Sequence, residues 1–165
     1  MKHDHIDRIL QQWQQQRPDL DCSPMAVLGR LSRIQPSVQK QLNTVFSSFD
    51  LSTIEFDILA TLRRSGKPLT PTELYQTLML SSGAMSTRLE KLVKRGLLER
   101  LANAEDRRSC TIELTSKGLK LIDKALEAHI ANEKIILKPL DQNEQIQLAS
   151  LLRRWLIHCE RNSDL

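Results

Sequence analysis

Residues 70–96, TPTELYQTLMLSSGAMSTRLEKLVKRG, carry the pattern of two short helices joined by a tight turn. Thr70 is followed three residues later by Glu73, which makes a capping box, and Pro71 stands at the first helical position, where proline is favoured. The second helix is expected to end at Gly96, which is suited to a left-handed cap. The segment therefore predicts a helix-turn-helix.

Two short apolar stretches, 97–101 and 111–114, follow the helix pair and flank a polar loop that contains Asp106, Arg107 and Arg108. We expect two antiparallel strands with the arginines at the tip of the hairpin. Long cations at such a tip are well placed to enter a DNA minor groove, where the phosphate potential is focused. The helices and the hairpin together predict a winged helix that contacts two adjacent grooves of a duplex.

Apolar residues recur at helical spacing outside this unit, which predicts five further helices. Their expected bounds are the amino terminus to about Arg17, Pro24 to about Phe49, Ser52 to Gly66, Thr115 to about Leu137, and Asp141 through Cys159. Pro36 lies inside the second of these helices and should kink it or break it locally. The fold class is therefore mainly α with a small β-hairpin wing.

The last predicted helix carries an apolar stripe that is wider than one small domain needs. The stripe comprises Leu148, Leu151, Leu152, Trp155, Leu156 and Cys159. We interpret it as part of a subunit interface, with burial inside a single chain as the alternative. The chain then divides into amino-terminal dimerisation helices at 1–49, a winged helix-turn-helix at 50–114 and carboxy-terminal dimerisation helices at 115–165.

The composition suits a helical protein with a basic surface. The 165 residues are 40% hydrophobic but only 4% aromatic, with 5 glycines, which disfavours an all-β fold. Residues 63–108 hold ten Lys or Arg against five Asp or Glu, whereas the rest of the chain holds 14 against 15, for a net charge of +4. This surplus fits an electrostatic footprint for DNA, and a solvated basic face is the alternative.

The chain lacks sequence marks of secretion, membrane insertion and metal binding. Its amino terminus, MKHDHIDRILQQW, has no apolar signal core, and no apolar run approaches the roughly 20 residues that cross a bilayer. Cys22, Cys110 and Cys159 are odd in number and far apart, which argues against a zinc site or a disulfide framework. We expect a cytoplasmic protein without cofactor, metal or membrane partner.

Small and hydroxyl-bearing residues mark the predicted DNA-facing side. The inward face of the second helix is formed by Met85, Leu89, Leu92 and Val93. Outward hydroxyls and free helix-start amides can bind bases and phosphates; the alternative is that the Ser and Thr residues serve only as helix caps. In the wing, Asp106 can pair with Arg108 and fix the side chain that enters the groove. The predicted DNA contacts are Thr70, Thr72, Ser81, Ser82, Gly83, Ala84, Ser86, Thr87, Lys91, Arg100, Asp106, Arg107 and Arg108.

As a set, these features resemble the MarR family of transcriptional regulators over nearly the whole chain. The matching motifs are the serine-rich start of the second helix, Leu89-Glu90-Lys91-Leu92, Arg95-Gly96-Leu97-Leu98-Glu99-Arg100, Asp106-Arg107-Arg108 and Ile112-Glu113-Leu114-Thr115-Ser116-Lys117-Gly118. The resemblance implies a homodimer held by its first and last helices, with two recognition helices about one DNA turn apart on a pseudo-palindrome. It also implies repression that a small molecule relieves.

A narrower resemblance links the chain to the urate-responsive PecS/HucR-like branch of that family. It rests on Gln11-Gln12-Trp13, on Arg17-Pro18-Asp19-Leu20-Asp21 and on the helix from Phe56 to Arg64. The resemblance implies a site for a small anionic aromatic effector, with Trp13, Asp57, Arg64 and Arg88 as its ligand-binding residues. Residues 1–49 would supply one wall of this site.

The chemistry of these four residues is coherent by itself. Asp57 and Arg64 are seven residues apart on one helix face and can form an ion pair. Arg88 can offer its guanidinium fork to a flat anion that stacks beside Trp13. A ligand that competes for Arg88 or breaks the Asp57–Arg64 pair would shift the second helix. The alternative is a structural ion-pair network, with Trp13 as a packing anchor.

Three other functions compete with this interpretation. The same fold could sense oxidants through a thiol, with Cys22 or Cys110 as the candidate. A winged helix can also serve protein–protein contact without DNA, but the wing arginines argue against this. An enzyme is disfavoured because the chain has no glycine-rich phosphate loop and no nucleophile motif, and His129 and His158 lie on helices without evident acidic partners.

Overall fold

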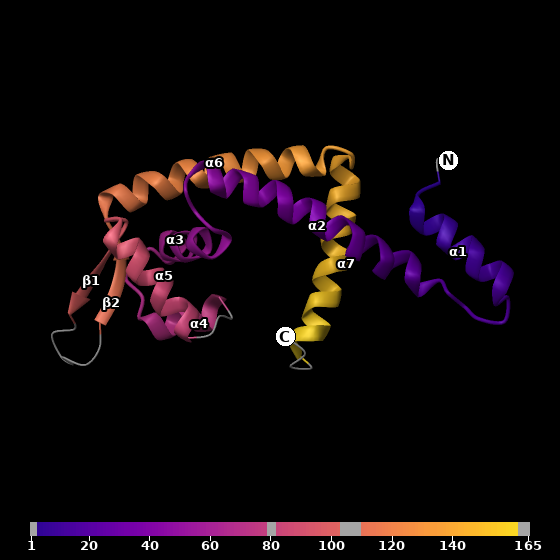
Figure 1. Cartoon of the computed structure of the whole chain (residues 1–165), viewed down its shortest axis with the longest axis horizontal. Coiled ribbons are helices and arrows are strands. Elements are labelled where there is room, and N and C mark those ends of the chain that lie inside the picture. The colour runs from indigo at the N-terminus through magenta and orange to yellow at the C-terminus, as the bar shows by residue number, and fades with distance from the viewer. Residues whose placement is uncertain (1–2, 79–81, 103–109, 162–165) are drawn as a thin grey trace.

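The computed structural model describes residues 3–78, 82–102 and 110–161. Within them the chain forms seven helices and one two-stranded antiparallel sheet (Figure 1). The elements are α1 (His5–Gln16), α2 (Pro24–Ser48), α3 (Thr53–Ser65), α4 (Pro71–Leu78), α5 (Ser82–Lys94), β1 (Leu98–Ala102), β2 (Cys110–Leu114), α6 (Ser116–Leu137) and α7 (Gln142–Arg161). The predicted fold class is confirmed, and the helix bounds agree with the predicted ones to within about two residues, except that α1 begins at His5.

Local capping explains where the helices begin and end. At the start of α3 the backbone N–H of Ser52 donates to Glu55 Oε2 at 2.8 Å, while the Glu55 N–H donates to Ser52 Oγ at 3.3 Å. Thr115 caps α6 through its hydroxyl, which accepts from the N–H of Gly118 at 3.0 Å. Gly66 and Gly96 have φ of 65° and 68°, a left-handed conformation that favours glycine and ends α3 and α5.

Pro36 does not interrupt α2. The helix is continuous from Pro24 to Ser48, so the predicted local break is absent. A proline removes only the hydrogen bond that its own nitrogen would donate, and the remaining backbone bonds of a 25-residue helix keep it intact.

One apolar core joins the winged helix to the long helices. Its fully buried members come from α3, α4, α5, the turn before β1, the sheet and α6, and include Ile58, Leu59, Leu74, Leu89, Leu92, Leu97, Ile112 and Ile122. Leu69 lies beside the sheet and exchanges two backbone hydrogen bonds with Ile112, of 3.0 and 2.7 Å. The core therefore fixes α4 and α5 relative to the hairpin and to the start of α6.

A tight turn carries the chain from the wing into α6. The N–H of Thr115 donates to the carbonyl oxygen of Leu97 at 3.1 Å, and the Thr115 hydroxyl donates to that of Gly96 at 2.7 Å. A Cβ atom at Gly118 would overlap the carbonyl oxygen of Leu97. Glycine is needed here because two backbones approach closely, and this sets the direction in which α6 leaves the winged helix.

The last helix has almost no partner within the chain. In Figure 1, α7 stands across the direction of α2 and α6, and it packs extensively against none of the other described elements. Its apolar stripe is solvent-exposed: 55% of Leu151, 42% of Trp155 and 50% of Leu156 are accessible. Burial of the stripe inside one chain, the alternative considered above, is therefore excluded.

Among the described elements, α1 makes extensive contacts with α2 alone. Ile6 is buried against Gly29, where a Cβ would lie 3.0 Å from Ile6 Cδ1. The guanidinium of Arg30 holds the two helices together, with Nε 2.8 Å from Asp4 Oδ2 and Nη2 2.6 Å from Asp7 Oδ1. Figure 1 places α1 at the opposite end of the molecule from α3 and α5.

Candidate nucleic-acid interface and effector site

The helix pair α4–α5 has the arrangement that the sequence predicts. Thr70 accepts from the Glu73 N–H at 3.2 Å, and its own N–H and hydroxyl donate to Glu73 Oε2 at 2.7 and 2.8 Å. The capping role of Thr70 is thus fulfilled, and its hydroxyl is committed to Glu73. Thr72 is exposed one residue after the first helical position. Thr72 therefore remains the freer candidate for a DNA contact.

The second helix, α5, presents opposite faces to the core and to solvent. Leu89 and Leu92 are buried, whereas Ser86 and Thr87 are exposed on the other side. Ser82, Gly83 and Ala84 fall within its first turn, but their side chains lie outside what the structure describes. The predicted contacts Ser81, Asp106, Arg107 and Arg108 also lie outside the described residues. Arg100 is exposed on β1.

Lys91 makes an ion pair that the sequence did not indicate. Its Nζ lies 2.9 Å from Oε1 of Glu55, whose side chain is only 1% exposed. Burial raises the pKa of Glu55, but the ammonium of Lys91 and the N–H of Ser52 outweigh burial and hold that pKa below its ordinary value. The charge of Lys91 therefore balances a buried carboxylate. A contact of Lys91 with a DNA phosphate stays a prediction, and the ion pair with Glu55 would compete with it.

The carboxyl end of α5 is tied to the turn between α2 and α3. Nη1 of Arg95 donates to the carbonyl oxygen of Asp50 at 2.7 Å, and Nη2 lies 3.1 Å from its carboxylate. Asp50 has φ of 54°, a left-handed conformation that aspartate tolerates better than most residues. Neither contact has a local sequence signal, because the two residues are 45 positions apart.

The predicted effector residues on α3, Asp57 and Arg64, interact electrostatically but do not form an ion pair. Burial raises the pKa of Asp57, while the nearby charges of Arg64 and His129 act to lower it. Among the described residues, however, no ion pair within 4.0 Å joins Asp57 to Arg64. Seven residues place two side chains on one face but about 10 Å apart along the axis, which explains why the predicted pair does not form.

His129 on α6 is part of this region, which sequence reasoning missed. Its ring lies 5.3 Å from the ring of Phe46 and 5.0 Å from that of Phe56. Its Nε2 lies 3.2 Å from Oε1 of Glu133, so the prediction that His129 has no acidic partner is wrong. A helical i,i+4 acid was visible in the sequence and could have been weighed. Its Nδ1 is buried without a hydrogen-bond partner among the described residues.

Arg88 and Trp13 differ in their relation to α3. Arg88 is partly buried on α5, which packs against α3, and it forms no hydrogen bond or ion pair within the described part of the chain. Trp13 is 41% exposed on α1, which packs on α2 instead. The structure thus places Asp57, Arg64 and Arg88 on two adjoining helices but does not bring Trp13 to them within one chain.

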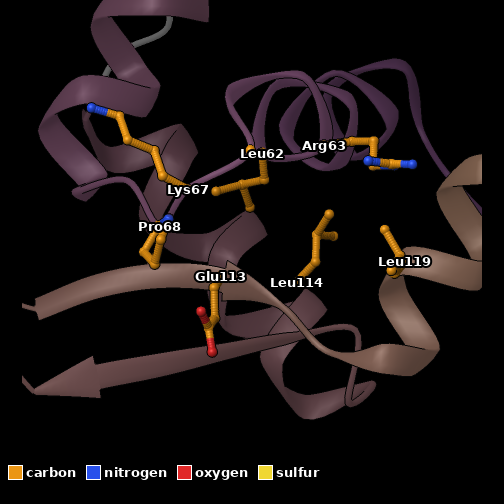
Figure 2. A pocket seen from close by; sticks show the side chains of 8 residues that line it. Leu62, Arg63, Lys67, Pro68, Glu113, Leu114 and Leu119 are labelled. Atoms are coloured by element: carbon orange, nitrogen blue, oxygen red, sulfur yellow. The ribbon is translucent and has the colours of Figure 1, made fainter.

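A hollow of about 230 Å³ lies elsewhere, at the base of the wing (Figure 2). Leu62, Leu114 and Leu119 turn their side chains toward it from α3, β2 and α6. Arg63 also lines it, but Nε of Arg63 donates to Oδ1 of Asp123 at 2.7 Å. None of the four predicted effector residues lines this hollow, so it does not coincide with the predicted effector site.

The competing interpretations receive no structural support from the described residues. The three cysteines are partly buried and free, and no group of His, Cys, Asp and Glu among the described residues could hold a metal ion. In the same ranges, no helix combines the length and apolarity that crossing a bilayer demands. The thiol-sensor alternative stays untested by the geometry.

The comparisons with known proteins agree with the motifs. The MarR family model matches residues 49–109. The chain is 42% identical to the HTH-type transcriptional regulator PecS of Dickeya dadantii over 159 residues, which cover 95% of this chain and 96% of that protein. It is 32% identical to the multiple antibiotic resistance protein MarR of Escherichia coli over 98 residues, 59% of this chain and 67% of that one.

Solved structures show the same fold. A mutant of MarR from E. coli in complex with operator DNA has a TM-score of 0.69 and 28% identity, with 83% of this chain and 99% of that chain covered. The apo form of wild-type MarR from E. coli has a TM-score of 0.68 and 29% identity, with 78% and 96% covered. Because it matches PecS over almost its entire length and has the winged helix of these structures, this chain belongs to the MarR family of DNA-binding transcriptional regulators.

Proposed function

We propose that this regulator is a homodimeric repressor, which binds a pseudo-palindromic operator and is released by a small flat anion of the urate type. The family is one of regulators, so an enzymatic function is excluded. The exposed apolar stripe of α7 is the single observation that carries the dimer. Large contiguous apolar surfaces on a chain that is otherwise well packed mark protein–protein contacts.

The dimer would join the helices at both ends of the chain. Exposed apolar side chains also line the first half of α2, among them Val27, Leu28, Leu31 and Ile34. Residues 1–49 and 115–165 would form the shared helical region, and residues 50–114 would form one DNA-binding unit per subunit. Symmetry then sets two copies of α5 about one helical turn of DNA apart, roughly 34 Å.

In the proposed complex α5 enters the major groove and the hairpin loop enters the minor groove. The support is the likeness to MarR of E. coli, which has been solved with operator DNA. The exposed hydroxyls of Ser86 and Thr87 lie on the solvent face of α5, and Arg100 is exposed on the first strand of the wing. Hydroxyls discriminate bases weakly, so shape readout by the wing would supply part of the specificity.

The effector is proposed to bind beside α3, between Asp57, Arg64 and Arg88. A partly buried carboxylate next to cationic groups can accept N–H donors of a flat ligand, while the guanidinium of Arg88 has no competing partner among the described residues. Since α1 lies far from α3 in the same chain, Trp13 can reach this site only from the other subunit. The proposed site therefore spans the subunit boundary.

The effector proposal is tested by release of labelled operator DNA, followed by fluorescence anisotropy. Urate should release the wild-type protein, whereas Arg88→Lys should need at least about tenfold more urate, because lysine keeps the charge but lacks the bidentate fork. Arg33→Lys, the same change at an exposed position of α2, is the matched control and should respond normally. No release of the wild type at saturating urate would remove the urate proposal; normal release of Arg88→Lys would remove Arg88 from the site.

A further inference from the structure

A second group of cations lies away from the predicted DNA contacts. Lys117, Lys120 and Lys124 follow one another along one face of α6 at spacings of three and four residues. Together with Arg95 they line a hollow of about 290 Å³. Leu97 and Leu121, which are buried and partly buried, form its apolar base.

The charges around this hollow are poorly balanced. Arg95 forms an ion pair with Asp50. Within the described ranges, none of the three lysines lies within 4.0 Å of an acidic group. Nζ of Lys117 donates one hydrogen bond to the carbonyl oxygen of Arg95, at 2.9 Å. Like charges three or four residues apart on a helix destabilise it. A multiply charged anion in the hollow would remove this repulsion.

In the proposed DNA complex the hollow lies away from the operator. Figure 1 shows α6 along the top of the winged helix, whereas α4 and the free ends of β1 and β2 point to the lower side. Arg95 directly follows the carboxyl end of α5, which meets the start of α6. A straight duplex held by the wing and the amino-terminal part of α5 would not reach the lysines.

We propose that this hollow binds a small, multiply charged phosphate anion, such as a polyphosphate or a phosphorylated metabolite. Three lysines and one arginine line a space that is too small for a macromolecule, and phosphate oxygens accept hydrogen bonds from both kinds of donor. An occupant would touch both groups that fix the end of α5, the Arg95 guanidinium and the Lys117 ammonium. The site is distinct from the one proposed for the flat effector.

Inorganic tripolyphosphate is a suitable probe, titrated by calorimetry into the full-length protein at low ionic strength. Lys120→Gln with Lys124→Gln removes two charges that form no hydrogen bond or ion pair within the described residues, so folding should persist, as thermal denaturation would verify. The affinity for tripolyphosphate should fall about tenfold, because two of the four cations that line the hollow are removed. The matched control is Lys134→Gln with Lys138→Gln, at the other end of α6, which should bind like the wild type.

Two results would overturn the proposal. Equal losses in both double variants would mean that the anion responds only to total charge. Unchanged tripolyphosphate binding, with a loss of affinity only for operator duplexes with long flanks, would mean that the lysines contact flanking DNA instead. Neither result depends on whether urate releases the operator.

Discussion

Placing charge on the apolar stripe of α7 should split the dimer. Leu152 and Leu156 lie one turn apart and are 41% and 50% exposed in the single chain. Full burial of a leucine contributes about 1.5–3 kcal/mol, so covering these exposed fractions contributes about 1.5–2.5 kcal/mol per subunit. A twofold axis doubles this, to about 3–5 kcal/mol. Leu152→Glu with Leu156→Glu should therefore raise the dimer dissociation constant by a factor on the order of 10² to 10⁴.

Sedimentation velocity over a range of protein concentrations measures this shift directly. Gln147→Glu with Ser150→Glu is the matched control, because it adds the same two carboxylates to the same helix outside the stripe. The control should remain dimeric, and circular dichroism should show that both variants are helical. Operator affinity should fall as the dimer is lost, since one subunit contacts only one half-site. If the leucine variant sediments as a dimer with wild-type affinity, the stripe is not the interface.

Three further predictions concern the winged helix. Gly118→Ala should lower the free energy of unfolding in urea by about 3 kcal/mol or more, because its Cβ would overlap the Leu97 carbonyl. Gly66→Ala is the comparison variant and should lower it by about 1 kcal/mol. A loss for Gly118→Ala no larger than that would show that the turn can relax. Lys91→Gln should cost about 1–2 kcal/mol at neutral pH. The pKa of Glu55 is lowered in the folded chain, so its ion pair stabilises above the unfolded pKa and this stabilisation is lost as pH falls through the folded one; the difference from wild type should shrink as the pH falls below the ordinary pKa of glutamate, and a pH-independent difference would contradict the pairing. The pKa of Asp57 is raised by burial, so its charge opposes folding as pH rises; Asp57→Asn should be at least as stable as wild type at pH 7 by urea denaturation, and a clear loss would contradict a desolvated carboxylate.

Features with a local physical cause could be predicted from the sequence. The capping boxes at Ser52 and Thr70 and the left-handed glycines at Gly66 and Gly96 each depend on residues within four positions. They fix the ends of helices whatever the rest of the chain does, which is why those bounds were predicted closely. The exposed stripe of α7 could also be predicted, because amphipathic spacing identifies a face that needs a partner.

Contacts between distant segments could not be predicted in the same way. The pair between Lys91 and Glu55 joins two helices whose residues have no common pattern, and Glu55 already had a complete role as a capping residue. The expected pair of Asp57 with Arg64 failed because helical periodicity gives the face and not the distance along the axis. Trp13 shows a further limit, since in the proposed dimer it would act across the subunit boundary, and no contact within one chain could then reveal its role.

The position of α3 accounts for how an effector could act on DNA binding. Glu55 and Asp57 are two residues apart on this helix: the first holds α5 through Lys91, and the second belongs to the proposed effector site. Arg95, one turn further along, is held separately on Asp50. Both anchors therefore lie at the carboxyl end of α5. A ligand that shifts α3 would pull on this end through Lys91, and the amino-terminal part of α5, which the proposed complex sets in the groove, would change direction. Such a change alters the spacing of two symmetry-related helices, and a duplex with fixed half-site separation is sensitive to that spacing.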